Sequence, residues 1–165
     1  MTTQVGGWQL DHAAVATRQC FSAQAAGTSV PCDCAGCRNF MAALDHAFPP
    51  AFRALAETLG IDWGREEATG LHLTGGWFHF AGSIVEGRDA FQKSGLSLEP
   101  FGAGFEVGFT SEVQLVPERF QLQPVITQLE FITRMPWVIY DDARPARRWR
   151  LGHVNVPSAR RHARH

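Results

Sequence analysis

The chain has 165 residues, of which 45% are hydrophobic and 19% are charged, and its formal net charge is −1 at pH 7. This composition is typical of a single globular domain that is large enough for a core of its own. No apolar run approaches the roughly 20 residues of a membrane helix, and residues 1–10 lack the basic and apolar regions of a secretory signal. We therefore expect a cytoplasmic protein without a membrane segment, in a reducing compartment where grouped thiols favour metal over disulfides.

Charge is distributed unevenly along the chain. All 16 acidic residues and 8 of the basic residues fall in residues 1–142, whereas residues 143–165 contain seven arginines and no acidic residue. Together with the motifs described below, this contrast predicts an irregular amino-terminal arm over 1–31, a single α+β metal-binding domain over 32–142 and an Arg-rich tail over 143–165.

The first thirty residues are weakly patterned. Gly6-Gly7 and the stretch of alanine, glycine and serine from Ser22 to Ser29 favour irregular backbone. We expect at most a short strand near Thr17–Gln24 in this arm.

Three cysteines, Cys32, Cys34 and Cys37, form a C-x-C-x2-C pattern directly ahead of a predicted helix. A disulfide between Cys32 and Cys34 would be strained, whereas clustered thiolates suit a tetrahedral Zn²⁺ ion that lowers the pKa of its ligands. The pattern therefore predicts a zinc knuckle. An iron–sulfur cluster also accepts four thiolates, and the same spacing is compatible with reduced structural cysteines or with redox-active or nucleophilic thiols.

A zinc site needs a fourth ligand. Cys20, upstream of the knuckle, is the first candidate, and His46, His72 and His79 are alternative ligands. Four protein ligands would make the zinc structural, whereas three ligands and a water would open the site to catalysis.

Two consecutive helices follow the knuckle. The first is predicted over 36–48, because apolar side chains recur at helical spacing, and Pro49-Pro50 ends it and begins the next. The second is predicted over Pro50–Leu59, with Gly60 as its left-handed cap. The short connection predicts a helical hairpin.

A β-hairpin is predicted next, with strands Leu71–Thr74 and Trp77–Phe80 joined by a turn at Gly75-Gly76. In this register His72 and His79 face each other, with Cβ atoms about 5 Å apart. They could bind a metal or transfer protons, or they could be two exposed polar positions of a half-buried hairpin.

The sequence that follows predicts an antiparallel sheet, against which the knuckle and the helical hairpin are expected to pack. Its expected segments are a strand extension at 81–86, a long loop over 87–104, a strand over Phe105–Leu115 with a bulge at Gly108, strands at Phe120–Leu122 and Val125–Phe131, and a central strand at Trp137–Tyr140.

The basic tail has the composition of a nucleic-acid contact, arginine beside an aromatic residue, here Trp149. The tail could instead be a solvated terminus, or it could fold onto the acidic surface of the domain. Its arginines are Arg144, Arg147, Arg148, Arg150, Arg160, Arg161 and Arg164.

Several short motifs together resemble a group of small uncharacterised bacterial proteins. The resemblance spans roughly Cys32 to Ile139 and implies that the cysteines are a family feature and that this region is one domain. The matching runs are C-x-C-x2-C-x-N-F, Leu59-Gly60-Ile61-Asp62, Gly76-Trp77-Phe78, Ala81-Gly82-Ser83-Ile84, Gln128-Leu129-Glu130-Phe131 and Pro136-Trp137-Val138.

Three functions fit these observations. The first is a non-catalytic binding module, of accessory or immunity type, with structural zinc and a protein partner. The second is a metalloenzyme with an open cysteine and histidine site. The third is nucleic-acid binding through the tail. The chain contains no P-loop, no G-x-G-x-x-G after a predicted strand, no H-E-x-x-H and no G-x-S-x-G motif.

Overall fold

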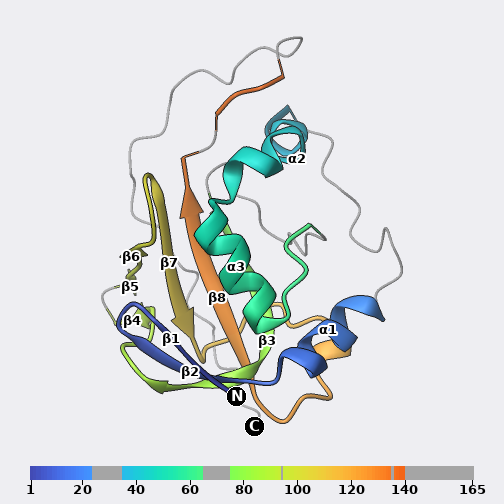
Figure 1. Cartoon of the computed structure of the whole chain (residues 1–165), viewed down its shortest axis with the longest axis vertical. Coiled ribbons are helices and arrows are strands. Elements are labelled where there is room, and N and C mark those ends of the chain that lie inside the picture. The colour runs from blue at the N-terminus through green and yellow to red at the C-terminus, as the bar shows by residue number, and fades with distance from the viewer. Residues whose placement is uncertain (24–34, 65–74, 94, 135, 140–165) are drawn as a thin grey trace, which may run out of the picture.

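The computed structural model describes residues 1–23, 35–64, 75–93, 95–134 and 136–139 (Figure 1). Its main sheet is antiparallel and has six strands in the order β1-β2-β3-β8-β7-β6, and a second, two-stranded sheet is formed by β4 and β5. The elements are β1 (Thr2–Val5), β2 (Trp8–His12), α1 (Ala14–Ser22), α2 (Ala35–Ala47), α3 (Pro50–Leu59), β3 (Gly75–Glu86), β4 (Phe91–Gln92), β5 (Gly95–Leu96), β6 (Glu99–Pro100), β7 (Phe105–Thr110), the 3-10 turn η1 (Glu118–Phe120) and β8 (Ile126–Thr133).

The fold is α+β, as predicted. Helix α3 lies across the face of the sheet formed by β3, β8 and β7, with α1 near one end of the sheet and α2 near the other (Figure 1). In the described part of the chain, no helix is both long enough and apolar enough to cross a membrane.

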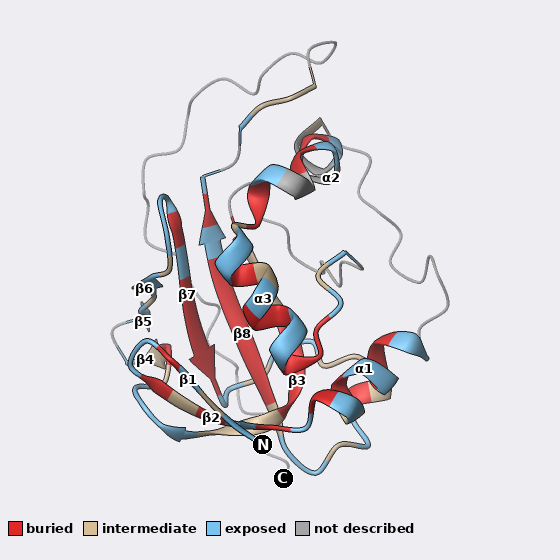
Figure 2. Ribbon diagram, viewed as in Figure 1, coloured by how far each residue is buried: buried red, intermediate tan, exposed pale blue. Residues whose placement is uncertain are grey.

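Helix α3 and the strands behind it carry many buried residues (Figure 2). Aromatic rings from the helix and the sheet pack against one another. Phe52 of α3 is fully buried and its ring centroid lies 4.8 Å from that of Phe105 and 5.9 Å from that of Phe131. Phe48 stacks on Phe52 at 5.0 Å and meets Phe131 edge to face at 5.3 Å. Such ring pairs add to the hydrophobic stabilisation, so this cluster fixes α3 on the sheet.

Both helices predicted after the cysteine pattern are confirmed, and local signals account for their ends. Pro50 is the first residue of α3, where its missing N–H has no helical partner to lose. Gly60 ends α3 with φ +79°, and the N–H of Ile61 donates to the carbonyl of Ala56 at 2.8 Å. A side chain at Gly60 would also collide with Ala14, because a Cβ atom at Gly60 would lie 2.2 Å from the carbonyl oxygen of Ala14.

The prediction of an irregular arm is wrong for residues 1–23. β1 and β2 form a hairpin that pairs with β3, and α1 occupies the place of the strand predicted near Thr17. Gly6 provides the turn at φ +51°, and Trp8 and Leu10 alternate into the core. The error arises because β2 pairs with a strand more than seventy residues further along the chain, as in the pair of Leu10 and Ile84.

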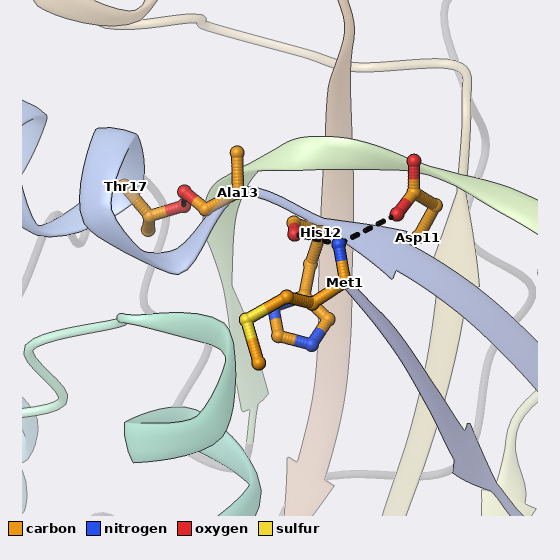
Figure 3. Close-up of polar contacts among 5 residues, drawn as sticks. All are labelled: Met1, Asp11, His12, Ala13 and Thr17. Carbon is orange, nitrogen blue, oxygen red and sulfur yellow. Dashed lines mark hydrogen bonds and ion pairs between the residues drawn. The ribbon is translucent and has the colours of Figure 1, made fainter.

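Polar contacts connect this hairpin to α1 (Figure 3). The amino-terminal ammonium of Met1 donates to Oδ1 of Asp11 and to the carbonyl of His12, each at 3.0 Å. Thr17 donates to the carbonyl of Ala13 at 3.2 Å, and its hydroxyl oxygen accepts from the N–H of Ala81 at 3.0 Å. The bond from Ala81 to Thr17 joins α1 to β3, whereas the bonds of Met1 hold the two ends of the hairpin together.

The predicted turn at Gly75-Gly76 is also wrong, because both glycines belong to β3 and pair with Ile132 and Phe131 of β8. A Cβ at Gly75 would lie 2.6 Å from the carbonyl oxygen of Phe131. Close approach between strands therefore accounts for a glycine at this position. The proposed partner strand, Leu71–Thr74, lies outside the described residues.

The second half of the sheet differs from the prediction in four places. The long loop predicted over 87–104 contains the short strands β4, β5 and β6. β7 ends at Thr110 instead of Leu115, the strand expected at Phe120 is the turn η1, and residues 136–139 form no strand. The strand expected over Val125–Phe131 is confirmed as β8. At Gly108 no register shift is seen; a Cβ there would lie 2.8 Å from the side chain of Ala90, so close packing explains the glycine.

Candidate functional site

Cys37 is the third residue of α2, so the last cysteine of the knuckle lies in the first turn of a helix. The backbone N–H groups of a first turn have no partner within the helix, and the helix dipole places partial positive charge there. Cys32 and Cys34 lie outside the described residues.

Asn39, two residues after Cys37, holds the segment 136–139 against α2. Its side-chain amide donates to the carbonyl of Pro136 at 3.0 Å, and its carbonyl oxygen accepts from the N–H groups of Val138 at 2.6 Å and Ile139 at 3.3 Å. Asn39 is 4% exposed. The start of α2 and the segment 136–139 are therefore joined by one buried side chain, which brings together two of the short motifs noted in the sequence.

Cys20 is buried in α1, with 4% of its surface exposed. Its thiol donates to the carbonyl of Arg119 at 3.4 Å, and its sulfur accepts from Nε2 of Gln123 at the same distance. A thiol that donates carries its proton, whereas a zinc ligand is a thiolate. Figure 1 also shows α1 and α2 well apart. Cys20 as the fourth ligand stays a prediction.

The alternative histidine ligands lie in different places. His46 is exposed in the last turn of α2, nine residues after Cys37. Nine residues span about 13 Å of helix axis, so these two positions of α2 are too far apart to share one ion with bonds of about 2 Å. His72 lies outside the described residues.

His79 is 1% exposed on β3, so its interpretation as an exposed polar position is wrong. It lies on the sheet face opposite the aromatic cluster, beside Gln128 and Glu130 of β8. His79 Nε2 is 3.0 Å from the carbonyl oxygen of Gln114, which can only accept, so this nitrogen carries the proton. The N–H of Gln114 donates to Gln128 at 2.7 Å, and Gln128 Nε2 donates to Glu130.

His79, Gln128 and Glu130 form a buried polar row. Burial shifts the pKa of its two titratable groups, His79 and Glu130. It lowers the pKa of His79, against the opposing effects of the Gln114 carbonyl and Gln128. It raises the pKa of Glu130, although the hydrogen bond from Gln128 opposes the shift. Both shifts favour the uncharged form. The hydrogen bonds that His79 and Gln128 share with the backbone of Gln114 fix the segment around Gln114 over the sheet.

The buried polar row makes stability depend on pH. The folded-state pKa of Glu130 lies above the usual pKa of a glutamate. The contribution of Glu130 to stability is therefore complete when the pH is below that usual pKa, and it is lost as the pH rises through the folded-state pKa. Glu130→Gln removes this titration, so we expect the stability of the variant relative to the wild type to increase as the pH rises above the usual pKa of a glutamate.

Denaturant unfolding at several pH values measures this difference. Glu106→Gln is the matched control, since Glu106 is an exposed carboxylate on the same face of the neighbouring strand. An unchanged pH dependence in Glu130→Gln would show that the Glu130 carboxyl is not perturbed by its surroundings.

A pocket of about 550 Å³ lies between α1 and the residues that follow α3. Sequence reasoning did not identify it, although Ile61-Asp62-Trp63-Gly64 places an acid and an aromatic residue directly after a helix end. Its lining residues are Arg18, Phe21, Ser22, Glu57, Gly60, Ile61, Asp62, Trp63 and Gly64.

Among the described residues, no three cysteine, histidine, aspartate or glutamate side chains are grouped so as to hold a metal ion. The arginines of the tail lie outside the described residues, so their contact with nucleic acid stays a prediction. The chain matches no protein-family model, no curated protein and no solved structure.

Proposed function

We propose that this protein is a non-catalytic binding domain in which a zinc ion, held by Cys32, Cys34 and Cys37, stabilises the start of α2. The observation that carries the proposal is the position of Cys37 in the first turn of α2, two residues before Asn39. A zinc ion bound there would support the helix turn from which Asn39 holds the segment 136–139. The zinc would thus act as a structural link.

Two further observations support binding over catalysis. The buried polar row of His79, Gln128 and Glu130 is enclosed; His79 and Gln128 each share a hydrogen bond with the backbone of Gln114, and Gln128 donates to Glu130. The pocket between α1 and α3 has a volume in the range of ligand sites, roughly 300–1,000 Å³. The polar groups of the sheet therefore serve the fold, and the concave surface is available for recognition.

Metal analysis of freshly purified, reduced protein tests the proposal. We expect about one zinc ion per chain, as a mononuclear site requires, and its loss in Cys34→Ser and Cys37→Ser. Cys20→Ser tests the fourth ligand separately: loss of zinc in this variant would assign Cys20 to the site, whereas retained zinc would exclude Cys20 as a ligand. A wild-type protein without zinc, or a Cys37→Ser variant with unchanged zinc, would contradict the proposal.

Chelation separates a structural from a catalytic ion. If zinc is structural, its removal lowers the melting temperature and exposes α2 to proteolysis, because metal-binding free energy is then part of the folding free energy. A metal-free protein that melts like the wild type would contradict the structural role.

A further inference from the structure

The main sheet ends in two edge strands that differ in how they are protected against pairing with a further strand. β6, at one edge, has two residues and contains Pro100, and short length and proline are both common protections of a sheet edge. β1, at the other edge, has the sequence Thr-Thr-Gln-Val, without a charge, a proline or a bulge. Threonine and valine also favour strands. β1 therefore has none of these protections.

The register shows which backbone groups of β1 point outward. The N–H of His12 donates to the carbonyl of Met1 at 2.7 Å, and the Met1 ammonium donates to the carbonyl of His12. Bonded and non-bonded pairs alternate along an antiparallel ladder, so Thr2 and Gln4 direct their N–H and C=O groups away from β2. Within the described residues, no hydrogen bond to these outward groups is found.

We propose that β1 pairs with β1 of a second copy of this chain, in an antiparallel dimer with twofold symmetry. With Thr3 on the twofold axis, Thr2 of each copy lies opposite Gln4 of the other. Each of these pairs exchanges two hydrogen bonds, so every outward group of both strands gains a partner. Because the same patch is used on both copies, the contact is isologous and closes at the dimer.

The charges around this edge suit a second copy as the occupant. The exposed side chains of β1 are uncharged, and beside them the Met1 ammonium and the Asp11 carboxylate form an ion pair at 3.0 Å. Glu99 lies at the turn after β1, since a Cβ at Gly6 would be 3.3 Å from its carboxylate oxygen. Antiparallel pairing would bring this carboxylate toward the Met1 ammonium of the other copy. Opposite charges thus approach at both ends of the paired strands, and no like charges face each other along them.

The paired strands are short, with four residues each. We therefore expect a dimer that forms in a concentration-dependent way, as is usual for small contacts. This inference goes beyond the proposed function and does not depend on zinc, because no residue of β1 belongs to the proposed metal site. Zinc content measured on the same samples keeps the two tests separate.

Sedimentation equilibrium of the full-length protein over a range of concentrations tests the proposal. Gln4→Pro removes an outward N–H from each copy and leaves the bonds between β1 and β2 in place. Gln4→Ala is the matched control, because it keeps this N–H. We expect the wild type and Gln4→Ala to dimerise, and Gln4→Pro to associate at least about tenfold more weakly. Melting curves check that both variants are folded.

Two results of this experiment would overturn the proposal. A wild-type protein that stays monomeric at every concentration would leave the edge to an extended segment of another chain. Equal dimerisation of Gln4→Pro and Gln4→Ala would place the contact elsewhere on the protein.

A charge exchange keeps the test decisive if Gln4→Pro does not fold. Thr2→Lys with Gln4→Lys places lysines opposite each other between the copies, and Thr2→Glu with Gln4→Glu places glutamates there. We expect each double variant to be monomeric alone and a mixture of the two to form a heterodimer. In the wild type, amide exchange at Gln4 should slow at high concentration, whereas that at Thr3, which is bonded to β2, should change little. A mixture that does not associate, or a dimer in which exchange at Gln4 is independent of concentration, would contradict the pairing of β1.

Discussion

Phe52→Ala is expected to destabilise the protein by about 3–5 kcal/mol, the usual cost of truncating a buried phenylalanine. Phe52 is 0% exposed, and its ring contacts those of Phe48, Phe78, Phe105 and Phe131 at centroid distances of 5.0, 6.1, 4.8 and 5.9 Å. Its removal leaves a cavity at the point where α3 meets the sheet. Equilibrium denaturant unfolding measures the change in the free energy of unfolding.

Two further variants make this result specific. Phe52→Leu retains most of the apolar volume and should cost less than Phe52→Ala. Leu122→Ala removes a side chain that is 88% exposed and should change the free energy of unfolding by less than about 0.5 kcal/mol. If Phe52→Ala were as stable as Leu122→Ala, the aromatic cluster would not hold α3 on the sheet.

Asn39→Ala is expected to cost about 2–4 kcal/mol and to release the segment 136–139 from α2. The substitution leaves the carbonyl of Pro136 and the N–H groups of Val138 and Ile139 without the partner they have in the wild type. The three hydrogen bonds are part-buried, and each contributes about 0.5–1.5 kcal/mol to stability. Hydrogen exchange at the amides of Val138 and Ile139 should accelerate in the variant.

Asn39→Asp is the conservative control, because a carboxylate still accepts from the two N–H groups but cannot donate to the carbonyl of Pro136. We expect an intermediate loss of stability and partial protection of Val138 and Ile139. Slow exchange in Asn39→Ala, equal to that of the wild type, would rule out Asn39 as the link between the start of α2 and this segment.

The two helices after the knuckle could be predicted because residues close in sequence determine them. Pro50 begins α3, Gly60 caps it, and the apolar side chains between them recur at helical spacing. The strand β8 was also predicted, from a run of β-forming residues over Val125–Phe131. None of these signals depends on a distant part of the chain.

The errors share a different cause, since each depends on contacts between distant residues. The hairpin β1–β2 completes its pairing only with β3. Gly75 appeared to mark a turn because the sequence does not show how closely the backbone of β8 approaches it. His79 appeared exposed because the segment around Gln114, which covers it, is 35 residues away. These features follow from tertiary packing, which local patterns do not encode.

The candidate site divides in the same way. The helix after the cysteine pattern was predicted correctly, since Cys37 lies in the first turn of α2; its role as a zinc ligand stays a prediction. The role of Asn39 could not be predicted, because its partners are 97 to 100 residues away. The pocket was not predicted, because Arg18 and Asp62 line one pocket only when α1 packs against the end of α3.

X-ray absorption at the zinc edge, on freshly purified and reduced protein, is the most direct test of the proposed knuckle. Coordination by Cys32, Cys34 and Cys37 predicts at least three sulfur neighbours at about 2.3 Å. A sample that contains no zinc, or a zinc ion surrounded only by nitrogen and oxygen at about 2.0–2.2 Å, would contradict it.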